Sequence, residues 1–189
     1  MAADLNKALI VDASIAGAAG QEEASYPTSK NCRDLLSAVL DSLHKIVMTP
    51  EIRQEWDDHQ QSFATRWLVA MERKAKIELH TSLRDEGLRD KMTNLIGQQI
   101  GRNKITQEAC AIMLKDCHLL EAALKSDKII LSLDNKARFH FKVVSDKIED
   151  ISAILWVNPD KAEEEAITWL EAGAEPEAHR QLGFRQTTQ

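Results

Sequence analysis

Four short runs of apolar residues, separated by segments with helical patterns, limit the fold of this 189-residue chain most strongly. The runs are Ala8–Val11, Lys45–Met48, Ile129–Leu133 and Ile151–Val157. They are continuous rather than alternating, which is typical of strands covered by helices on both faces. Strands that alternate with helices are joined by right-handed crossovers. The sequence therefore predicts an α/β fold with a central, mostly parallel sheet of about four or five strands.

Helical patterns fill the intervals between these runs. Leucines and valine repeat at spacings of three and four over residues 35–43. Thr49-Pro50-Glu51 is a typical helix start, with a hydroxyl cap, a proline in the first turn and then an acidic residue. We expect further helices in the ranges 63–83, 88–100, 109–124 (open to a break at its middle), 136–144 and, after a capping box at Asp160, 160–170.

The chain is expected to form one domain over residues 1–172, with a helical elaboration at about 58–105. Residues 173–189, which begin with a glycine and contain Pro176, are expected to be a flexible tail. The apolar segment near the N-terminus does not resemble a signal peptide, because Asp4 and Asp12 stand where such a peptide has positive or apolar residues.

The net charge of −6 argues against a protein that coats nucleic acid or anionic membrane by bulk charge. The acidity is local, however, because residues 146–177 hold ten acidic and only two basic residues. The rest of the chain has a net charge of +2, so a polyanionic substrate is not excluded there.

Three cysteines, Cys32, Cys110 and Cys117, show no spacing of a zinc site or a disulfide framework. No apolar run approaches the roughly 20 residues that span a bilayer. We therefore expect a cytoplasmic protein that does not enter the membrane.

Acidic residues follow two of the predicted strands. Asp12 comes directly after the first run, and Asp134 comes directly after the run Ile129–Leu133. A carboxylate at the end of a buried strand is costly unless it is paired or binds a cation. In parallel sheets, ligands bind at the carboxyl ends of the strands, beside a switch in strand order. Glu55 and Asp116 lie on helices that can reach the same edge.

This ordered set resembles the PIN-domain nucleases, which include the toxin ribonucleases of bacterial toxin–antitoxin pairs. In that family an Asp closes the first strand, a Glu lies on the helix after the second, an Asp opens a helix before a later strand, and an Asp closes that strand. The matching segments are Ala8–Ser14, Ile46–Glu55 and Lys115–Asp134. The resemblance covers roughly residues 6–57 and 106–158. It implies a PIN-like three-layer α/β/α fold.

The resemblance also implies a site and a reaction. Asp12, Asp116 and Asp134 would be ligands of Mg²⁺ or Mn²⁺, and Glu55 a further ligand or a group that orients water. Single-stranded RNA would be hydrolysed there by an endoribonuclease mechanism. An antitoxin or other protein partner, and a homodimer, follow by analogy with the family. The auxiliary polar residues would be Ser14, Ser132 and Asn135, and the substrate-binding residues would be Arg53, Lys115, Lys136 and Arg138.

Two alternatives remain open. A non-catalytic PIN-like module would keep the fold for binding RNA or protein, and two features favour it: the long segment 58–105 and the absence of a further acid beside Asp134, where Asn135 follows. A phosphatase of the haloacid dehalogenase type also begins with an Asp after the first strand. It ranks lower, because the second Asp which that family needs is replaced by Ser14.

Overall fold

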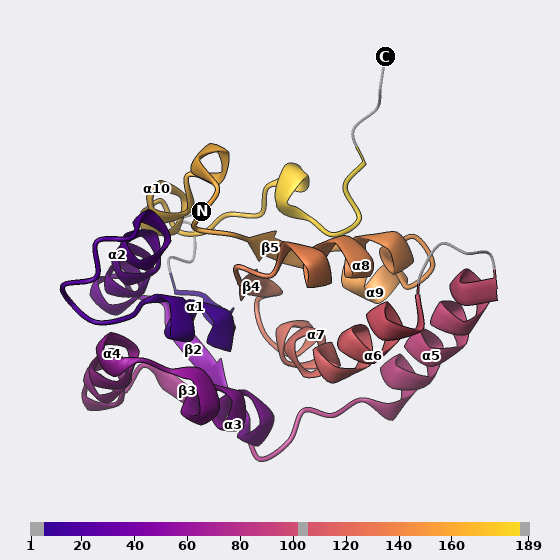
Figure 1. The fold of residues 1–189 in the computed structure, drawn as a ribbon, viewed down its shortest axis with the longest axis horizontal. Coiled ribbons are helices and arrows are strands. Elements are labelled where there is room, and N and C mark those ends of the chain that lie inside the picture. Colours follow the sequence, from indigo (N-terminus) through magenta and orange to yellow (C-terminus); the bar gives the residue numbers. More distant parts are fainter. Residues whose placement is uncertain (1–5, 102–105, 186–189) are drawn as a thin grey trace.

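A single five-stranded sheet lies at the centre of the computed structural model, which describes residues 6–101 and 106–185 (Figure 1). Every neighbouring pair of strands is parallel, and the order across the sheet is β3-β2-β1-β4-β5. The strands are β1 Ala8–Val11, β2 Lys45–Met48, β3 Ile77–Leu79, β4 Ile129–Leu131 and β5 Leu155–Val157. The predicted α/β class with a parallel sheet is confirmed.

Helices flank the sheet, in an arrangement consistent with a three-layer α/β/α fold (Figure 1). Helix α7 packs against β1 and β4, whereas α2 packs against α4 and α10. The α-helices are α1 Ala13–Ala18, α2 Pro27–Asp41, α3 Pro50–His59, α4 Ser62–Arg73, α5 Glu86–Gly101, α6 Gln107–Lys115, α7 Cys117–Leu124, α8 Asn135–Ser145, α9 Glu149–Ser152 and α10 Ala166–Glu171. Two short 3-10 helices are η1 Ala162–Glu164 and η2 Ala178–Arg180.

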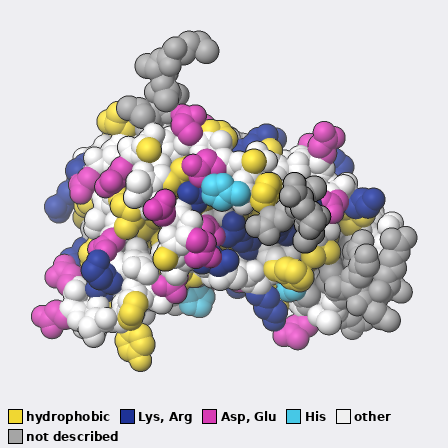
Figure 2. All heavy atoms as spheres, turned by 90° about the horizontal axis from the view of Figure 1, so that it is seen from above, with side chains coloured by type: hydrophobic (Ala, Val, Ile, Leu, Met, Phe, Trp, Pro, Cys, Tyr) yellow, Lys and Arg dark blue, Asp and Glu magenta, His cyan; other side chains and the backbone are white. Residues whose placement is uncertain are grey.

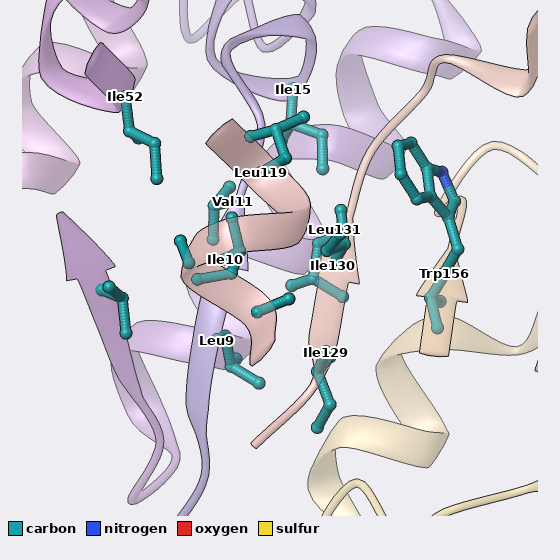
Figure 3. Close-up of a cluster of buried hydrophobic side chains, with 14 of the residues drawn as sticks. Leu9, Ile10, Val11, Ile15, Ile52, Leu119, Ile129, Ile130, Leu131 and Trp156 are labelled. Atoms are coloured by element: carbon teal, nitrogen blue, oxygen red, sulfur yellow. The ribbon is translucent and has the colours of Figure 1, made fainter. Parts of the chain in front are cut away.

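The hydrophobic core surrounds the central strands. Leu9 and Ile10 of β1, Ile130 of β4 and Trp156 of β5 are all fully buried, and Figure 3 shows them beside side chains from the covering helices. Because both faces of the strands are covered, continuous apolar runs were the correct signal for β1, β2 and β4.

The prediction of one helix over residues 63–83 is wrong for the second half of that range. Helix α4 ends at Arg73, and Ala75 has a left-handed backbone with φ 53°. The chain then forms β3, which pairs with β2 at the sheet edge. The segment expected as a helical elaboration at 58–105 therefore also supplies a strand; its residues 102–105 lie outside the described residues.

Helix α2 ends at Asp41, so Leu43 is not part of its apolar stripe and is 66% exposed. The Lys76 ammonium is buried and donates hydrogen bonds to the carbonyls of Val39, Leu40 and Ser42. These carbonyls lie at the end of the helix, where backbone acceptors lack helical partners and favour a cation.

Two further predictions near the C-terminus need correction. The run Ile151–Val157 forms a strand only from Leu155, because α9 takes up residues 149–152. Asp160 does not cap a helix; its carboxylate accepts hydrogen bonds from Thr28 and Asn31, and α10 begins only at Ala166.

The segment after Gly173 does not have the expected character of a flexible tail. Gln181 forms a bridge with Leu155 of β5, and Leu182 is buried. Arg180 is also buried, with its guanidinium over the Trp169 ring. An apolar anchor and a cation–π contact thus fix this segment, while residues 186–189 of the expected tail lie outside the described residues. Across the described part of the chain, no helix is long and apolar enough to cross a membrane.

Candidate active site

The carboxyl ends of β1 and β4 lie side by side at the centre of the sheet. Val11 is in register with Leu131, and the Asp12 amide donates to the Leu131 carbonyl. The chain passes from β1 to β2 on one side and later returns to β4 on the other, so this is the switch in strand order where α/β sheets bind ligands. The two strands are neighbours, and this brings Asp12 and Asp134 to the same edge.

Serine hydroxyls join the two strand ends. Ser14 and Ser132 both donate to Oδ2 of Asp12, at 2.5 and 2.6 Å. The amide of Leu133 donates to the Ser14 hydroxyl, and the amide of Asp134 donates to the Ser132 hydroxyl. Asp12 stands at the start of α1 but makes no side-chain capping bond there. The two serines therefore hold the Asp12 carboxylate in place through Oδ2. Its other oxygen, Oδ1, accepts no hydrogen bond among the described residues.

Glu55 reaches the same edge on α3. The Thr49 hydroxyl caps this helix by accepting a hydrogen bond from the Ile52 amide, as the sequence predicts. One residue after Glu55, the buried indole of Trp56 donates to the Val11 carbonyl at 2.8 Å. This bond ties α3 to the end of β1 and so fixes the position of Glu55.

Asp116 lies at the break between α6 and α7, where the sequence allowed an interruption. It stands at the N-terminus of α7, but its side chain makes no capping hydrogen bond there. Burial, and then the negative charges of Asp12, Glu55 and Asp134, raise the pKa of Asp116 to about 6, against an opposing effect of Lys115. The four acids thus interact electrostatically although they come from four separate segments.

One pocket of about 420 Å³ is lined by all four predicted acids, Asp12, Glu55, Asp116 and Asp134. We call it the acidic pocket; its other lining residues are Ala13, Ser14, Gly17, Ala18, His59, Lys115, Leu119, Ala137 and Trp156. Within residues 6–101 and 106–185, no three His, Cys, Asp or Glu side chains form a group that could hold a metal ion. The carboxylates share the pocket without converging on one point.

The partners of the acids explain this separation. The Asp134 carboxylate accepts a hydrogen bond from the Ala137 amide at 2.8 Å, as the N-cap of α8. Glu55 lies 3.3 Å from the Lys115 ammonium and 3.3 Å from Nε2 of His118. These two groups, His118 foremost, lower the pKa of Glu55 despite its partial burial.

His118 is a residue of this site that the sequence pattern did not indicate. It is buried, and its Nδ1 is 2.9 Å from the Lys115 carbonyl, so Nδ1 carries a proton and donates. Nε2 lies 3.3 Å from the Glu55 carboxylate and forms an ion pair with it when the ring is protonated. Burial lowers the pKa of His118, but the Glu55 carboxylate and the Lys115 carbonyl outweigh burial and raise it overall.

A second unforeseen feature is the Trp156 indole, which the sequence placed in the core. It is fully buried and also lines the acidic pocket, yet its N–H has no hydrogen-bond partner among the described residues. No spacing in the sequence indicates this, because it depends on how β5 lies beside β4.

Several residues predicted to bind substrate lie elsewhere. Arg53 pairs with Asp57 and Glu72, on a different side of α3 from Glu55. Arg138 pairs with Glu164 and lines another cavity together with Asn135. Lys136 is exposed and does not line the acidic pocket. Of the predicted basic residues, only Lys115 lies in the pocket.

The fold and the site define an α/β protein with a parallel sheet and an acidic pocket at the switch in strand order. No family model, no curated protein and no solved structure matches this chain. The function must therefore be inferred from the geometry and chemistry of the acidic pocket.

Proposed function

We propose that this protein is a metal-dependent nuclease, in particular an endoribonuclease that hydrolyses phosphodiester bonds of single-stranded RNA. One observation carries the proposal: Asp12, Glu55, Asp116 and Asp134, from four separate segments, line one pocket at the carboxyl edge of the central strands. Buried carboxylates repel one another unless a cation offsets their charge, and the raised pKa of Asp116 is the mark of such repulsion together with burial.

The donor set fits a hard divalent cation. All four acids offer oxygen ligands, which suit Mg²⁺ or Mn²⁺ rather than zinc. Asp12, Asp116 and Asp134 would hold the ion, and Glu55 would be a further ligand or orient the attacking water. Such an ion, when bound, supplies a Lewis acid that lowers the pKa of water and offsets charge on the phosphodiester.

The protein's own groups would prepare this chemistry. Ser14 and Ser132 orient the Asp12 carboxylate by donating hydrogen bonds to one of its oxygens. Lys115 is 68% exposed at the pocket, so its ammonium can leave Glu55 and contact a phosphate. His118 is buried behind Glu55 and would keep that carboxylate ionised.

A PIN-like identity would account for the order of the four acids along the chain. Asp12 follows β1, Glu55 lies on the helix after β2, Asp116 begins the helix before β4, and Asp134 follows β4. These positions agree with the family scheme that the sequence resembles. The acidic pocket supports this proposal because it joins the four positions in space.

One observation favours a second candidate, a non-catalytic PIN-like module that binds RNA or protein. Glu55 is already paired with Lys115 and His118, and among the described residues no three acids form a group for a metal ion. A protein that keeps these pairs would bind a partner without cleaving it.

Cleavage of end-labelled single-stranded RNA distinguishes the candidates. Purified protein is incubated with Mg²⁺ or Mn²⁺ and, separately, with chelator. The proposal predicts cleavage with either ion, none in chelator, and a loss of on the order of a hundredfold or more in the Asp12→Asn and Asp134→Asn variants. Asp90→Asn, the same change at an exposed position of α5, is the matched control and should cleave normally.

Cleavage that persists in chelator, or in both site variants, would contradict the metal–carboxylate mechanism. RNA that is bound but never cut would favour the non-catalytic module.

A further inference from the structure

A second cavity, of about 590 Å³, lies beside the acidic pocket on the other side of the first turn of α8. Asp134 and Ala137 line the acidic pocket, whereas Asn135 and Arg138 line the second cavity. We call the second cavity the α8 pocket; its remaining lining residues are Phe139, Lys142, Lys161, Glu163, Glu164, His179, Phe184 and Arg185. Figure 2 looks onto the side of the molecule where α8 and the segment 178–185 lie, and it shows basic side chains gathered around a histidine with acidic ones beside them.

Positive charge is in excess in the α8 pocket. Four Lys or Arg residues line it against two Glu residues. Glu164 is occupied, because it pairs with Arg138 and accepts a hydrogen bond from the Asn158 amide. Within the described part of the chain, Lys142 and Lys161 form no ion pair, so their charges are not offset by a bound carboxylate.

The cations of this pocket are close enough to affect one another. Partial burial, and then the positive charges of Arg138, Arg185 and Lys161, lower the pKa of Lys142. The Lys142 ammonium lies 6.0 Å from the centre of the Phe184 ring rather than beside a carboxylate. Crowded cations of this kind are stabilised when an anion binds between them.

An aromatic side chain is exposed at the same place. Phe139 lines the α8 pocket and is 60% exposed, although an apolar ring of this size is normally buried. Unpaired cations together with an exposed aromatic ring are the combination that binds single-stranded nucleic acid, in which phosphates pair with Lys or Arg and bases stack on the ring.

We propose that the α8 pocket binds single-stranded RNA next to the scissile bond, with phosphate oxygens at Lys142 and Lys161 and a base stacked on Phe139. This inference rests on the proposed function, since it places the substrate strand across the first turn of α8, from the acidic pocket to the α8 pocket. The helix rises about 1.5 Å per residue, so Asp134 and Lys142 are only about 12 Å apart along it, and one strand can contact both. An acidic peptide would also meet the cations, but it would leave the exposed Phe139 ring without a stacking partner.

Binding in chelator tests this proposal without requiring cleavage. Fluorescence anisotropy would follow a labelled single-stranded RNA oligonucleotide of mixed sequence over a series of salt concentrations. For Lys142→Gln/Lys161→Gln, the slope of log affinity against log salt should become shallower by about 1.4, or about 0.7 for each lost phosphate contact. For Phe139→Ala, affinity should fall about fivefold or more.

Matched controls remove the same number of positive charges, or one aromatic ring, from other surfaces of the protein. Lys30→Gln/Lys125→Gln removes two charges from α2 and from the end of α7, and Tyr26→Ala removes an aromatic side chain that is 78% exposed. All the variants change side chains that are at least partly exposed, and thermal unfolding would check that each is folded. The controls should bind RNA like the original protein.

Equal losses of RNA affinity in the α8 pocket variants and in the controls would overturn the proposal. An absence of RNA binding by the unmodified protein would also overturn it. A polyglutamate peptide is the second probe, and binding of the peptide through Lys142 and Lys161 without RNA binding would also overturn it, in favour of a protein partner. If RNA binds through this pocket but is not cut with Mn²⁺, the α8 pocket proposal stands and the nuclease proposal fails. If RNA is cut but Lys142→Gln/Lys161→Gln and Phe139→Ala bind and cut it normally, the nuclease proposal stands and the α8 pocket proposal fails.

Discussion

Asp116 is the acid whose surroundings oppose its charge most clearly. Burial and three neighbouring carboxylates raise its pKa to about 6, whereas an Asp in the unfolded chain has a pKa near 3.9. The folded state therefore binds the proton more tightly than the unfolded state, and it loses stability as the pH rises from about 4 to 6. Such a cost is expected where a cation normally offsets the charge.

Replacing Asp116 should therefore stabilise the protein in the absence of metal. At pH 7.5 in chelator, Asp116→Asn should raise the free energy of unfolding by about 1–3 kcal/mol, because it removes a buried charge beside Asp12, Glu55 and Asp134. Urea unfolding of both proteins measures this difference. A destabilised Asp116→Asn protein would show that the carboxylate has a structural partner instead.

Asp134 has two roles that two substitutions separate. Its carboxylate caps α8 at the Ala137 amide and also lines the acidic pocket. Asn is as good a cap as Asp, so Asp134→Asn should change stability by less than about 0.5 kcal/mol, whereas Asp134→Ala should cost about 1 kcal/mol. Cleavage should be lost in both. Activity retained in Asp134→Asn would reduce Asp134 to a helix cap.

His44 should make stability depend on pH. It is buried; Nδ1 accepts a hydrogen bond from the Lys7 amide, and Nε2 is 2.9 Å from the Leu170 carbonyl, so the neutral ring with a proton on Nε2 satisfies both partners. Burial lowers the pKa of His44, as do the charges of Lys76 and Lys7, while the Leu170 hydrogen bond and the charge of Asp127 oppose this.

Because the unfolded chain binds the proton more readily, stability should fall as the pH drops below about 6.5. Between pH 7.5 and 5.5 the loss should be about 1 kcal/mol greater in the original protein than in His44→Gln. Urea unfolding at the two pH values checks this, and an equal pH dependence in both proteins would exclude His44 as the cause.

At the scale of elements, the sequence predicted the buried central strands and missed the strand at the edge of the sheet. Strands β1 and β2 have the predicted bounds, because a continuous apolar run is required where both faces are covered. Strand β3 was missed, because it lies at the sheet edge, where Leu79 is 79% exposed and Glu78 interrupts the apolar pattern. An edge strand contacts fewer neighbours and so needs no such run.

The same distinction applies to the site. The four acids could be predicted because strand ends and helix starts fix their positions in a parallel sheet. Of the four predicted basic residues only Lys115 lies in the pocket, because helix phase decides where such side chains point. Two residues apart on α3, Arg53 and Glu55 point to different sides. Arg138 is drawn to Glu164, a contact across 26 positions of the chain that no local pattern indicates.

The attachment of α3 to β1 gives a test at this scale. Trp56→Phe removes the indole donor of the Val11 carbonyl, whereas Trp156→Phe makes the same change at a buried indole that has no partner among the described residues. Trp56→Phe should lower the free energy of unfolding by about 1–3 kcal/mol more than Trp156→Phe. Thermal unfolding of each variant is compared with that of the original protein. Equal losses of unfolding free energy in the two variants would mean that the bond to Val11 contributes nothing to stability.

At the scale of the whole molecule, net charge alone is a poor guide to the partner. The chain has a net charge of −6, yet the excess of acids lies in residues 146–177, and one of the two lysines of that range, Lys161, lines the α8 pocket. The acidic pocket lies at the carboxyl ends of the central strands, and the cationic α8 pocket lies beside it, across the first turn of α8. This is the arrangement that a phosphodiester strand and a divalent cation would share.

Titration with Mn²⁺, followed by the loss of its free electron paramagnetic resonance signal, tests the central claim most directly. The claim is that the carboxylates of the acidic pocket act together as a cation site. At pH 7.5 the unmodified protein and Asp90→Asn should bind Mn²⁺ with equal affinity, and Asp12→Asn, Asp116→Asn and Asp134→Asn should each bind it on the order of tenfold or more weakly. Binding that is the same in all five proteins, or absent from all of them, would contradict the claim.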